Sequence, residues 1–255
     1  MAHIDIDGLI TWTETRGNSE QTVVLLHGGL GNSDDLLDSI GPDIEQNFRI
    51  VAFDRRGHGY TPDTEEPFHY DDMAEHAIKV LERLDLPSRV HLVGWSDGGI
   101  VAMLVALRRP DLVDRLVLIG TNFHFEGLHA DISDDSPAGD AMLASYAARS
   151  PDGGEHFAVV AEKFMAMAFS EPTLTTRDVA RLERPTLVLV GDDDMVHLDH
   201  TVELYEALPA GRLCVLPGAS HAVVLEHPRM VAAIITDFLK GPEAPETIFP
   251  IRRAD

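Results

Sequence analysis

A serine with the setting of a nucleophile lies in the segment Gly94-Trp95-Ser96-Asp97-Gly98. The apolar run from Val90 to Val93 predicts a buried strand before it, and the spacing of apolar residues over 100–107 predicts a helix after it. A serine on a sharp turn between strand and helix points its hydroxyl out of the sheet, and its strained backbone requires small residues two positions away on either side. Because Gly-x-Ser-x-Gly occurs by chance in roughly one chain of this length in ten, the flanking strand and helix carry the prediction.

A serine hydroxyl reacts weakly unless a histidine accepts its proton and an acid orients that histidine. These partners are expected on loops that directly follow strands, because ligands lie beyond the carboxyl ends of a parallel sheet. Two loops qualify: residues 190–196 carry three consecutive aspartates after one apolar run, and residues 217–221 end in His221 after another. The chain order is then serine, aspartate, histidine. Asp192 is an alternative acid and His227 an alternative base, although the position of His227 at a helix start favours a capping role.

The surrounding chain alternates between predicted strands and helices. Residues 3–15 alternate in polarity and predict an antiparallel pair of strands. Apolar runs predict further strands at 23–26, 48–53, 89–94, 115–119, 185–190 and 211–216, and helical spacing predicts helices at 70–84, 98–108, 198–207 and 230–239. This alternation is typical of an α/β fold with a mostly parallel, doubly wound sheet that helices cover on both faces.

The alternation stops over residues 121–184, where no strand is predicted. We interpret this segment as a helical cap inserted into a core of residues 1–120 and 185–240. It begins with an acidic loop of small residues at 129–140. One of its helices has an apolar face that is expected chiefly to pack on the core, formed by Phe157, Ala161, Phe164, Met165 and Ala168. Residues 241–255, with three prolines and two consecutive arginines, predict an extended C-terminal tail.

The composition limits the classes of partner. A formal charge of −23 disfavours nucleic acids and anionic membranes because it repels phosphate groups, so a small-molecule substrate is the expected partner. The single cysteine, Cys214, cannot form an internal disulfide and is expected at a strand position in the core. No secretory leader and no apolar run long enough to span a bilayer are visible, so we expect a cytoplasmic protein. Assembly into a homo-oligomer is left open.

Taken together, the motifs resemble those of the αβ-hydrolase fold family over almost the whole chain. Five of them occur in the family's order: His27-Gly28-Gly29, Asp54-x-Arg56-Gly57-x-Gly59, Gly94-x-Ser96-x-Gly98, Gly191-x-x-Asp194 and Gly218-x-x-His221. The resemblance implies Ser96 as nucleophile, His221 as base and Asp194 as acid, since the family places the acid third after the glycine. It also implies an oxyanion hole formed by the backbone amides of Gly29 and Asp97. We expect no metal and no cofactor.

The turn that carries Ser96 between strand and helix is called the nucleophile elbow. Asp97 is the residue of this elbow that indicates a substrate. Gly-Trp-Ser-Asp-Gly-Gly is similar to the elbow of the valacyclovir hydrolase (biphenyl hydrolase-like) subgroup, in which the acid after the nucleophile recognises the ammonium group of an amino-acid ester. Alternatively, Asp97 only favours the helix start through the helix dipole. Asp97 does not fit the nucleophile slot of families with an aspartate nucleophile, because the glycines would then be needed at positions 95 and 99, and position 95 is tryptophan.

The resemblance implies a serine hydrolase that cleaves a small carboxylic ester through an acyl-enzyme, with an α-amino-acid ester, a lactone or an amide as variants. Hydrolysis of a carbon–carbon bond or perhydrolysis on the same triad, and binding without catalysis on the same fold, are the alternatives. The candidate substrate-binding residues are Asp97, Leu30, Trp95, Phe123 and Val196.

The remaining histidines and the arginine pair have plainer interpretations. Arg55 and Arg56 are expected to anchor loops through ion pairs. The other histidines are expected at the surface or on a pocket wall, namely His58, His91, His124 and His197.

Overall fold

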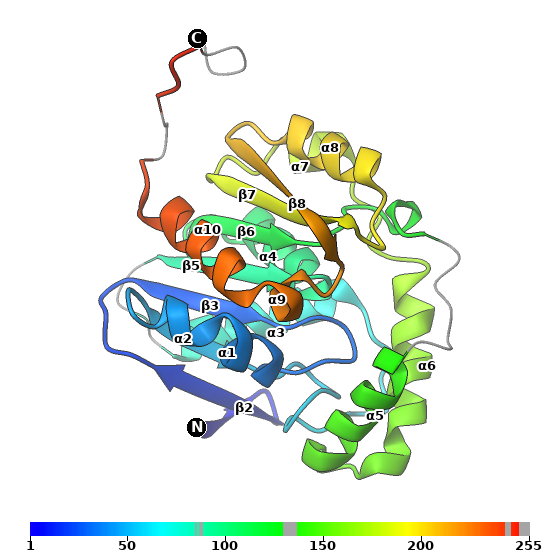
Figure 1. The fold of residues 1–255 in the computed structure, drawn as a ribbon. Coiled ribbons are helices and arrows are strands. Elements are labelled where there is room, and N and C mark those ends of the chain that lie inside the picture. Colours follow the sequence, from blue (N-terminus) through cyan, green and yellow to red (C-terminus); the bar gives the residue numbers. More distant parts are fainter. Residues whose placement is uncertain (85, 87–88, 130–136, 243–245, 250–255) are drawn as a thin grey trace.

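The computed structural model describes residues 1–84, 86, 89–129, 137–242 and 246–249. Its centre is an eight-stranded sheet in the order β1-β2-β4-β3-β5-β6-β7-β8 (Figure 1). β2 pairs antiparallel with β1 on one side and with β4 on the other, and all pairings from β4 to β8 are parallel. The predicted fold class is confirmed. The strands are β1 (Ala2–Ile6), β2 (Leu9–Arg16), β3 (Thr22–Leu26), β4 (Arg49–Phe53), β5 (Val90–Trp95), β6 (Val113–Ile119), β7 (Thr186–Asp193) and β8 (Gly211–Ser220).

The central strands are buried on both faces, which explains their continuous apolar sequences. Successive side chains point to opposite faces of a strand. In β3, Val24 and Leu26 therefore lie in one core cluster, whereas Val23 and Leu25 lie in the other. β5 and β6 alternate in the same way, so both faces of the sheet need helical cover.

Two groups of helices supply this cover (Figure 1). α3, α4 and α8 contribute apolar side chains to one cluster, and α1, α2, α9 and α10 contribute to the other. All four predicted core helices are present. The core helices are α1 (Asp34–Ser39), α2 (Gly41–Ile44), α3 (Tyr70–Arg83), α4 (Asp97–Arg108), α8 (Leu198–Ala207), α9 (Val223–Glu226) and α10 (Pro228–Lys240).

Three short helices were not predicted. α1, α2 and α9 have six, four and four residues, too few to show a helical period in the sequence. Gly41 and Pro42, the first two residues of α2, also interrupt the helical pattern of the sequence. Pro42 lies in the first turn of α2, where its missing N–H costs nothing.

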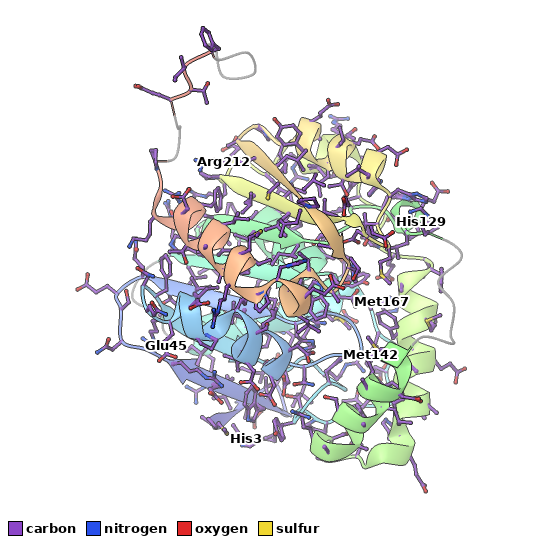
Figure 2. The ribbon with its side chains drawn as sticks, viewed as in Figure 1. His3, Glu45, His129, Met142, Met167 and Arg212 are labelled. Atoms are coloured by element: carbon purple, nitrogen blue, oxygen red, sulfur yellow. The ribbon has the colours of Figure 1, made fainter. Side chains whose placement is uncertain are left out.

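The described part of residues 121–184 contains helices and no strand, only two isolated bridges. Figure 1 shows α5 and α6 side by side beyond the carboxyl ends of the strands, and Figure 2 places Met142 and Met167 in this pair. Most of the predicted loop 129–140 lies outside the described residues, which lack 130–136. The helices of this segment are η1 (Phe125–Gly127), α5 (Pro137–Arg149), η2 (Gly154–His156), α6 (Phe157–Ala168) and α7 (Thr176–Val179).

The predicted apolar face of α6 is wrong in one residue. Met165 is 41% exposed, whereas Val160 and Met167 are buried. The residues of α6 that pack against the core are Phe157, Val160, Phe164 and Met167, at the spacing i, i+3, i+7 and i+10. The packed face is therefore rotated slightly from the predicted one.

The predicted position of Cys214 is wrong, and the predicted tail 241–255 is only partly described by the structure. β8 is the edge strand of the sheet, so Cys214 is half-buried instead of lying in the core. Within the predicted tail, Arg212 donates a hydrogen bond to the Pro242 carbonyl at 2.5 Å, and Ile248 and Phe249 are exposed. Residues 243–245 and 250–255 lie outside the described chain.

The packing of the elbow glycines makes a first prediction. A Cβ atom on Gly98 would lie 2.0 Å from the Leu26 carbonyl oxygen, so Gly98→Ala forces α4 away from β3. We expect this variant to lose at least about 2 kcal/mol of unfolding free energy in urea denaturation. Gly28→Ala is the matched control, because its Cβ would meet nothing closer than 3.4 Å. Equal stability of Gly98→Ala and wild type would contradict the close approach.

Candidate active site

The three residues of the predicted triad follow directly after three strands. Ser96 comes after β5, Asp194 after β7 and His221 after β8, at the carboxyl edge of the sheet. The His221 Nδ1 atom lies 2.7 Å from Asp194 Oδ1. The Asp194 side chain is 1% exposed, whereas the His221 side chain is 17% exposed. An ionised carboxylate only accepts hydrogen bonds, so Nδ1 carries the proton and Nε2 is left to accept one.

The backbone of Ser96 has the conformation of a nucleophile elbow. Its φ is 54° and its ψ is −120°, values that are costly for a residue with a side chain. Its N–H donates to the Ile119 carbonyl at 2.7 Å, which ties the turn to β6. A Cβ atom on Gly94 would lie 2.2 Å from the Gly98 carbonyl oxygen, so both flanking glycines are required by close packing. Ser96, and not Asp97, has the strained backbone of the nucleophile slot.

Trp95 and Gly120 connect the elbow to the histidine loop. The Trp95 indole N–H donates to the His221 carbonyl at 2.9 Å. Gly120 follows β6, and a Cβ atom there would lie 2.9 Å from His221 Nδ1 and 3.1 Å from Asp194 Oδ2. Only a glycine leaves space for the acid–histidine pair at this strand end. Gly120 could not be identified from the sequence, because the space that it leaves is filled by loops distant in the chain.

The alternative acid and base occupy other positions. Asp192 Oδ1 accepts hydrogen bonds from the Gly218 and Ala219 amides at 2.6 and 3.2 Å, which joins the ends of β7 and β8. His227 stands at the N-cap of α10 as expected, but its side chain makes no capping hydrogen bond. Of the three consecutive aspartates, Asp194 is the one that reaches His221.

Gly29 and Asp97, the residues predicted to form the oxyanion hole, lie beside each other in the structure. A Cβ atom on Gly29 would lie 2.7 Å from Asp97 Oδ2, so the two residues are neighbours. Among the described residues, none accepts a hydrogen bond from the Gly29 N–H. Asp97 is the first residue of α4, where a helix leaves its N–H groups without internal partners. Leu30, the next residue after Gly29, has a φ of 54° and donates its N–H to His58 Nε2 at 3.3 Å.

The Asp97 side chain is buried against an unexpected partner. Asp97 is 5% exposed, and its Oδ1 accepts a hydrogen bond from the Tyr70 hydroxyl at 2.8 Å. Its Oδ2 has no hydrogen-bond partner in the described part of the chain. Burial raises the pKa of Asp97, while the positive charge of Arg55 and the Tyr70 hydrogen bond act to lower it. Tyr70 looked like an ordinary helix start, so the sequence did not identify it.

Phe164 of α6 covers the same site. Its ring would lie 2.2 Å from a Cβ atom on Gly29. The sequence placed Phe164 on an apolar face but could not say what that face covers. A helix from residues 121–184 therefore reaches Gly29.

The other predicted substrate-binding residues remain predictions. Phe123 and Val196 are buried, and Leu30 is half-buried. The Phe123 ring stacks on His200 with centroids 4.1 Å apart, and the Val196 N–H donates to Asp194 Oδ1 at 2.9 Å. Trp95 packs in the core and supports His221. All four surround the strand ends that carry the candidate triad.

One histidine interpretation and one arginine interpretation are wrong. His91 is buried within β5 instead of lying at the surface or on a pocket wall. His58 is buried between the rings of His27 and Phe68, and its position on a pocket wall stays a prediction. Arg56 lies 3.7 Å from Asp63, as an ion-pair anchor would. Arg55 instead donates hydrogen bonds to backbone carbonyl groups.

Metal-binding clusters and membrane-spanning helices are both absent from the described residues. Within them, no three His, Cys, Asp or Glu side chains are placed to hold a metal ion. None of the helices in the described ranges has the length and apolar character needed to cross a bilayer.

The chain belongs to the alpha/beta hydrolase fold family, whose profile matches residues 21–158. Human serine hydrolase BPHL is 25% identical over 260 residues, which covers 94% of this chain and 86% of the human protein, in agreement with the resemblance of the elbow. The pimeloyl-[acyl-carrier protein] methyl ester esterase of Neisseria meningitidis serogroup B is 27% identical over 251 residues. The matched stretch covers 86% of this chain and 93% of the esterase. A meta-cleavage product hydrolase from Pseudomonas fluorescens IP01 shares the fold, with a TM-score of 0.73, 22% identity and coverage of 94% and 97% of the two chains.

The buried His58 makes stability depend on pH. Burial, followed by the charge of Arg55, lowers the pKa of His58 to about 3, so below pH 6.5 the unfolded chain takes up a proton that the folded chain does not. This uptake removes up to about 3 kcal/mol of stability as the pH falls from 6.5 to 4. We therefore expect urea denaturation of His58→Gln to show a shallower loss of stability on acidification than wild type.

The exposed His3 offers the control, because His3→Gln should leave the slope unchanged. Asp54, whose pKa burial raises to about 6, contributes a slope of opposite sign in both proteins, which the difference between variant and wild type removes. A His58→Gln curve parallel to wild type over this range would refute the assignment.

Proposed function

We propose that this chain is a serine hydrolase that cleaves a small carboxylic ester through an acyl-enzyme on Ser96. The observation that carries the proposal is the 2.7 Å hydrogen bond from His221 to the buried Asp194, beside a serine with a φ of 54°. Binding alone does not require a serine, a histidine and an acid in this arrangement, which argues against a non-catalytic member of the fold.

In the proposed mechanism, His221 Nε2 removes the Ser96 hydroxyl proton as Ser96 Oγ attacks the ester carbonyl carbon. The carbonyl oxygen gains the negative charge and accepts hydrogen bonds from the amides of Gly29 and Asp97. His221 then protonates the departing alkoxide and leaves an acyl group on Ser96. A water molecule, deprotonated by His221, releases the acid and restores the serine. Asp194 holds the imidazole with Nδ1 protonated throughout.

We propose that residues 121–184 form a cap over this site and set the size of the substrate. Phe164 of α6 covers Gly29, which supports an acyl group of modest size. Asp63 ties the cap to the core, because its buried carboxylate lies 2.7 Å from Lys163 Nζ and 3.0 Å from His156 Nε2. Lactones and amides meet the same catalytic groups, and carbon–carbon bond hydrolysis and perhydrolysis are the alternative reactions on this triad.

The triad is tested by replacing the nucleophile. Ser96→Ala removes the attacking oxygen, and we expect kcat for p-nitrophenyl acetate to fall at least about 1,000-fold. A fluorophosphonate label should modify wild type at Ser96 and leave Ser96→Ala unlabelled. His227→Ala, at the alternative base, should keep most of the activity. Substantial turnover by purified Ser96→Ala would overturn the proposed function.

A second candidate substrate is an α-amino-acid ester, which the unpartnered Asp97 Oδ2 favours. This oxygen is buried beside Gly29 and has no hydrogen-bond partner among the described residues. A buried carboxylate oxygen without a donor is costly, and the ammonium group of a bound substrate would supply one. The ammonium would then lie next to the acyl carbon, as it does in an α-amino ester.

This candidate is tested by comparing an amino-acid ester with its deaminated analogue. We expect wild type to prefer the ammonium-bearing ester by about tenfold in kcat/KM, and Asp97→Asn to lose that preference while still hydrolysing the analogue. Tyr70→Phe serves as a control, because it removes the hydroxyl from the other carboxylate oxygen. A preference that is absent, or that survives in Asp97→Asn, would leave Asp97 as a helix-start acid.

A further inference from the structure

Arg55 is a buried arginine that reaches the backbone of the neighbouring strand end. It is the second residue after β4 and is 1% exposed. Its guanidinium donates one hydrogen bond to the His27 carbonyl at 2.6 Å and another to the Gly28 carbonyl at 3.1 Å. Both carbonyls belong to the segment that leads from β3 to Gly29. The planar fork of an arginine suits two adjacent acceptors, and a lysine could not reproduce it.

The Gly28 carbonyl and the Gly29 N–H belong to one peptide group. A trans peptide is planar, and its C=O and N–H point in opposite directions. A donor that fixes the Gly28 oxygen on the protein side therefore directs the Gly29 N–H away from the protein. Gly28 lies beside the elbow, since a Cβ atom on it would be 3.6 Å from Ser96 Cβ. The direction of the Gly29 N–H is thus set by what binds the Gly28 oxygen.

His27 supplies a second donor to the same oxygen. Its Nδ1 lies 2.7 Å from the Gly28 carbonyl, and its Nε2 accepts the Arg55 N–H at 3.2 Å. This pair of contacts is satisfied only with the proton on Nδ1. Burial, followed by the charge of Arg55, lowers the pKa of His27 well below its usual range, which keeps the ring neutral. Both lone pairs of the Gly28 oxygen are therefore occupied, one by the Arg55 guanidinium and the other by His27, whose Nε2 accepts the backbone N–H of Arg55.

The charge of Arg55 bears on the second free amide. A buried cation needs a compensating anion. Burial lowers the pKa of Arg55, and the negative charge of Asp97 acts to raise it. In return, Arg55 offsets the negative charge that Asp97 places beside the site of oxyanion formation. Without Arg55, this carboxylate would oppose the developing charge that the Asp97 amide is there to bind.

We propose that Arg55 is a positioning residue of the oxyanion hole, which orients the Gly28–Gly29 peptide through its hydrogen bonds to the His27 and Gly28 carbonyls. This inference rests on the proposed function, because it presumes an oxyanion at the amides of Gly29 and Asp97. Arg55 itself does not touch the substrate. Its removal should weaken binding of the transition state more than binding of the ester.

The test compares Arg55→Met, Arg55→Lys and the neighbouring Arg56→Met. Active sites are counted by fluorophosphonate labelling, so that only folded enzyme enters kcat. For p-nitrophenyl acetate we expect Arg55→Met to lower kcat about 100-fold with KM within about threefold of wild type. Arg55→Lys retains the charge but not the fork, and should recover part of the loss. Arg56→Met, which loses contacts to Thr64, Glu66 and Pro67, should keep kcat within about threefold of wild type.

A second readout reports on the oxyanion hole itself. Phenylboronic acid forms a tetrahedral adduct with an active-site serine, and its inhibition constant should rise in parallel with the fall in kcat across the variants. A purely structural role would lower the melting temperature and leave both quantities unchanged per labelled site. If Arg55→Met does not fold, Arg55→Lys decides, with lower kcat and weaker boronate binding expected at constant KM.

Failure of this inference is distinguishable from failure of the proposed function. Wild-type kcat and boronate affinity in folded Arg55→Met or Arg55→Lys, or an equal loss in Arg56→Met, would overturn the role of Arg55 while Ser96 remained the labelled nucleophile. Turnover by Ser96→Ala, or a label on another residue, would instead overturn the proposed function itself.

Discussion

The strained backbone of Ser96 is the constraint on which the arrangement of the site depends. A residue with a side chain at a φ of 54° and a ψ of −120° costs on the order of 1–3 kcal/mol, and it persists only where the surrounding packing over-determines it. Here β3 abuts Gly98 and β6 binds the Ser96 N–H. β3 and β6 belong to the same parallel part of the sheet as β7 and β8, so Asp194 and His221 arrive at the same edge of the sheet as Ser96.

The site also requires that its buried charges be balanced. Arg55 and Asp97 are both almost fully buried in a chain whose formal charge is −23. The net charge says little about such a site, because its energetics depend on which opposite charges and donors lie within a few ångströms. Arg55 is balanced by carbonyl oxygens and Asp97, and Asp97 by Arg55 and Tyr70. The polar interior is thus built around the two amides proposed to bind the oxyanion.

The sequence predicted the parts of this site that depend on strand ends, and missed those that depend on side-chain direction across elements. Continuous apolar runs located the parallel strands, and the candidate triad follows because each member is the first residue after a strand. Tyr70, Gly120 and the contacts of Arg55 had no signal, since periodicity gives the faces of an element but not the residues opposite them. The error at Met165 has the same origin, as a rotation of α6 by a fraction of a turn exchanges it for Val160.

The loop after β4 contacts both the segment that carries Gly29 and the helix α6 that covers it. Its first residue, Asp54, accepts hydrogen bonds from the Ser33 and Tyr60 amides at 2.8 and 2.9 Å, which fixes the loop against the segment that follows Gly29. Arg55 then fixes the Gly28 carbonyl, and Asp63 binds Lys163 of α6. Because α6 also carries Phe164 over Gly29, the same loop determines where the free amide points and how closely the helix covers it. Within this loop, Arg55 therefore acts on the orientation of the oxyanion donor, whereas Asp63 acts on the position of α6 and so on the space for the acyl group.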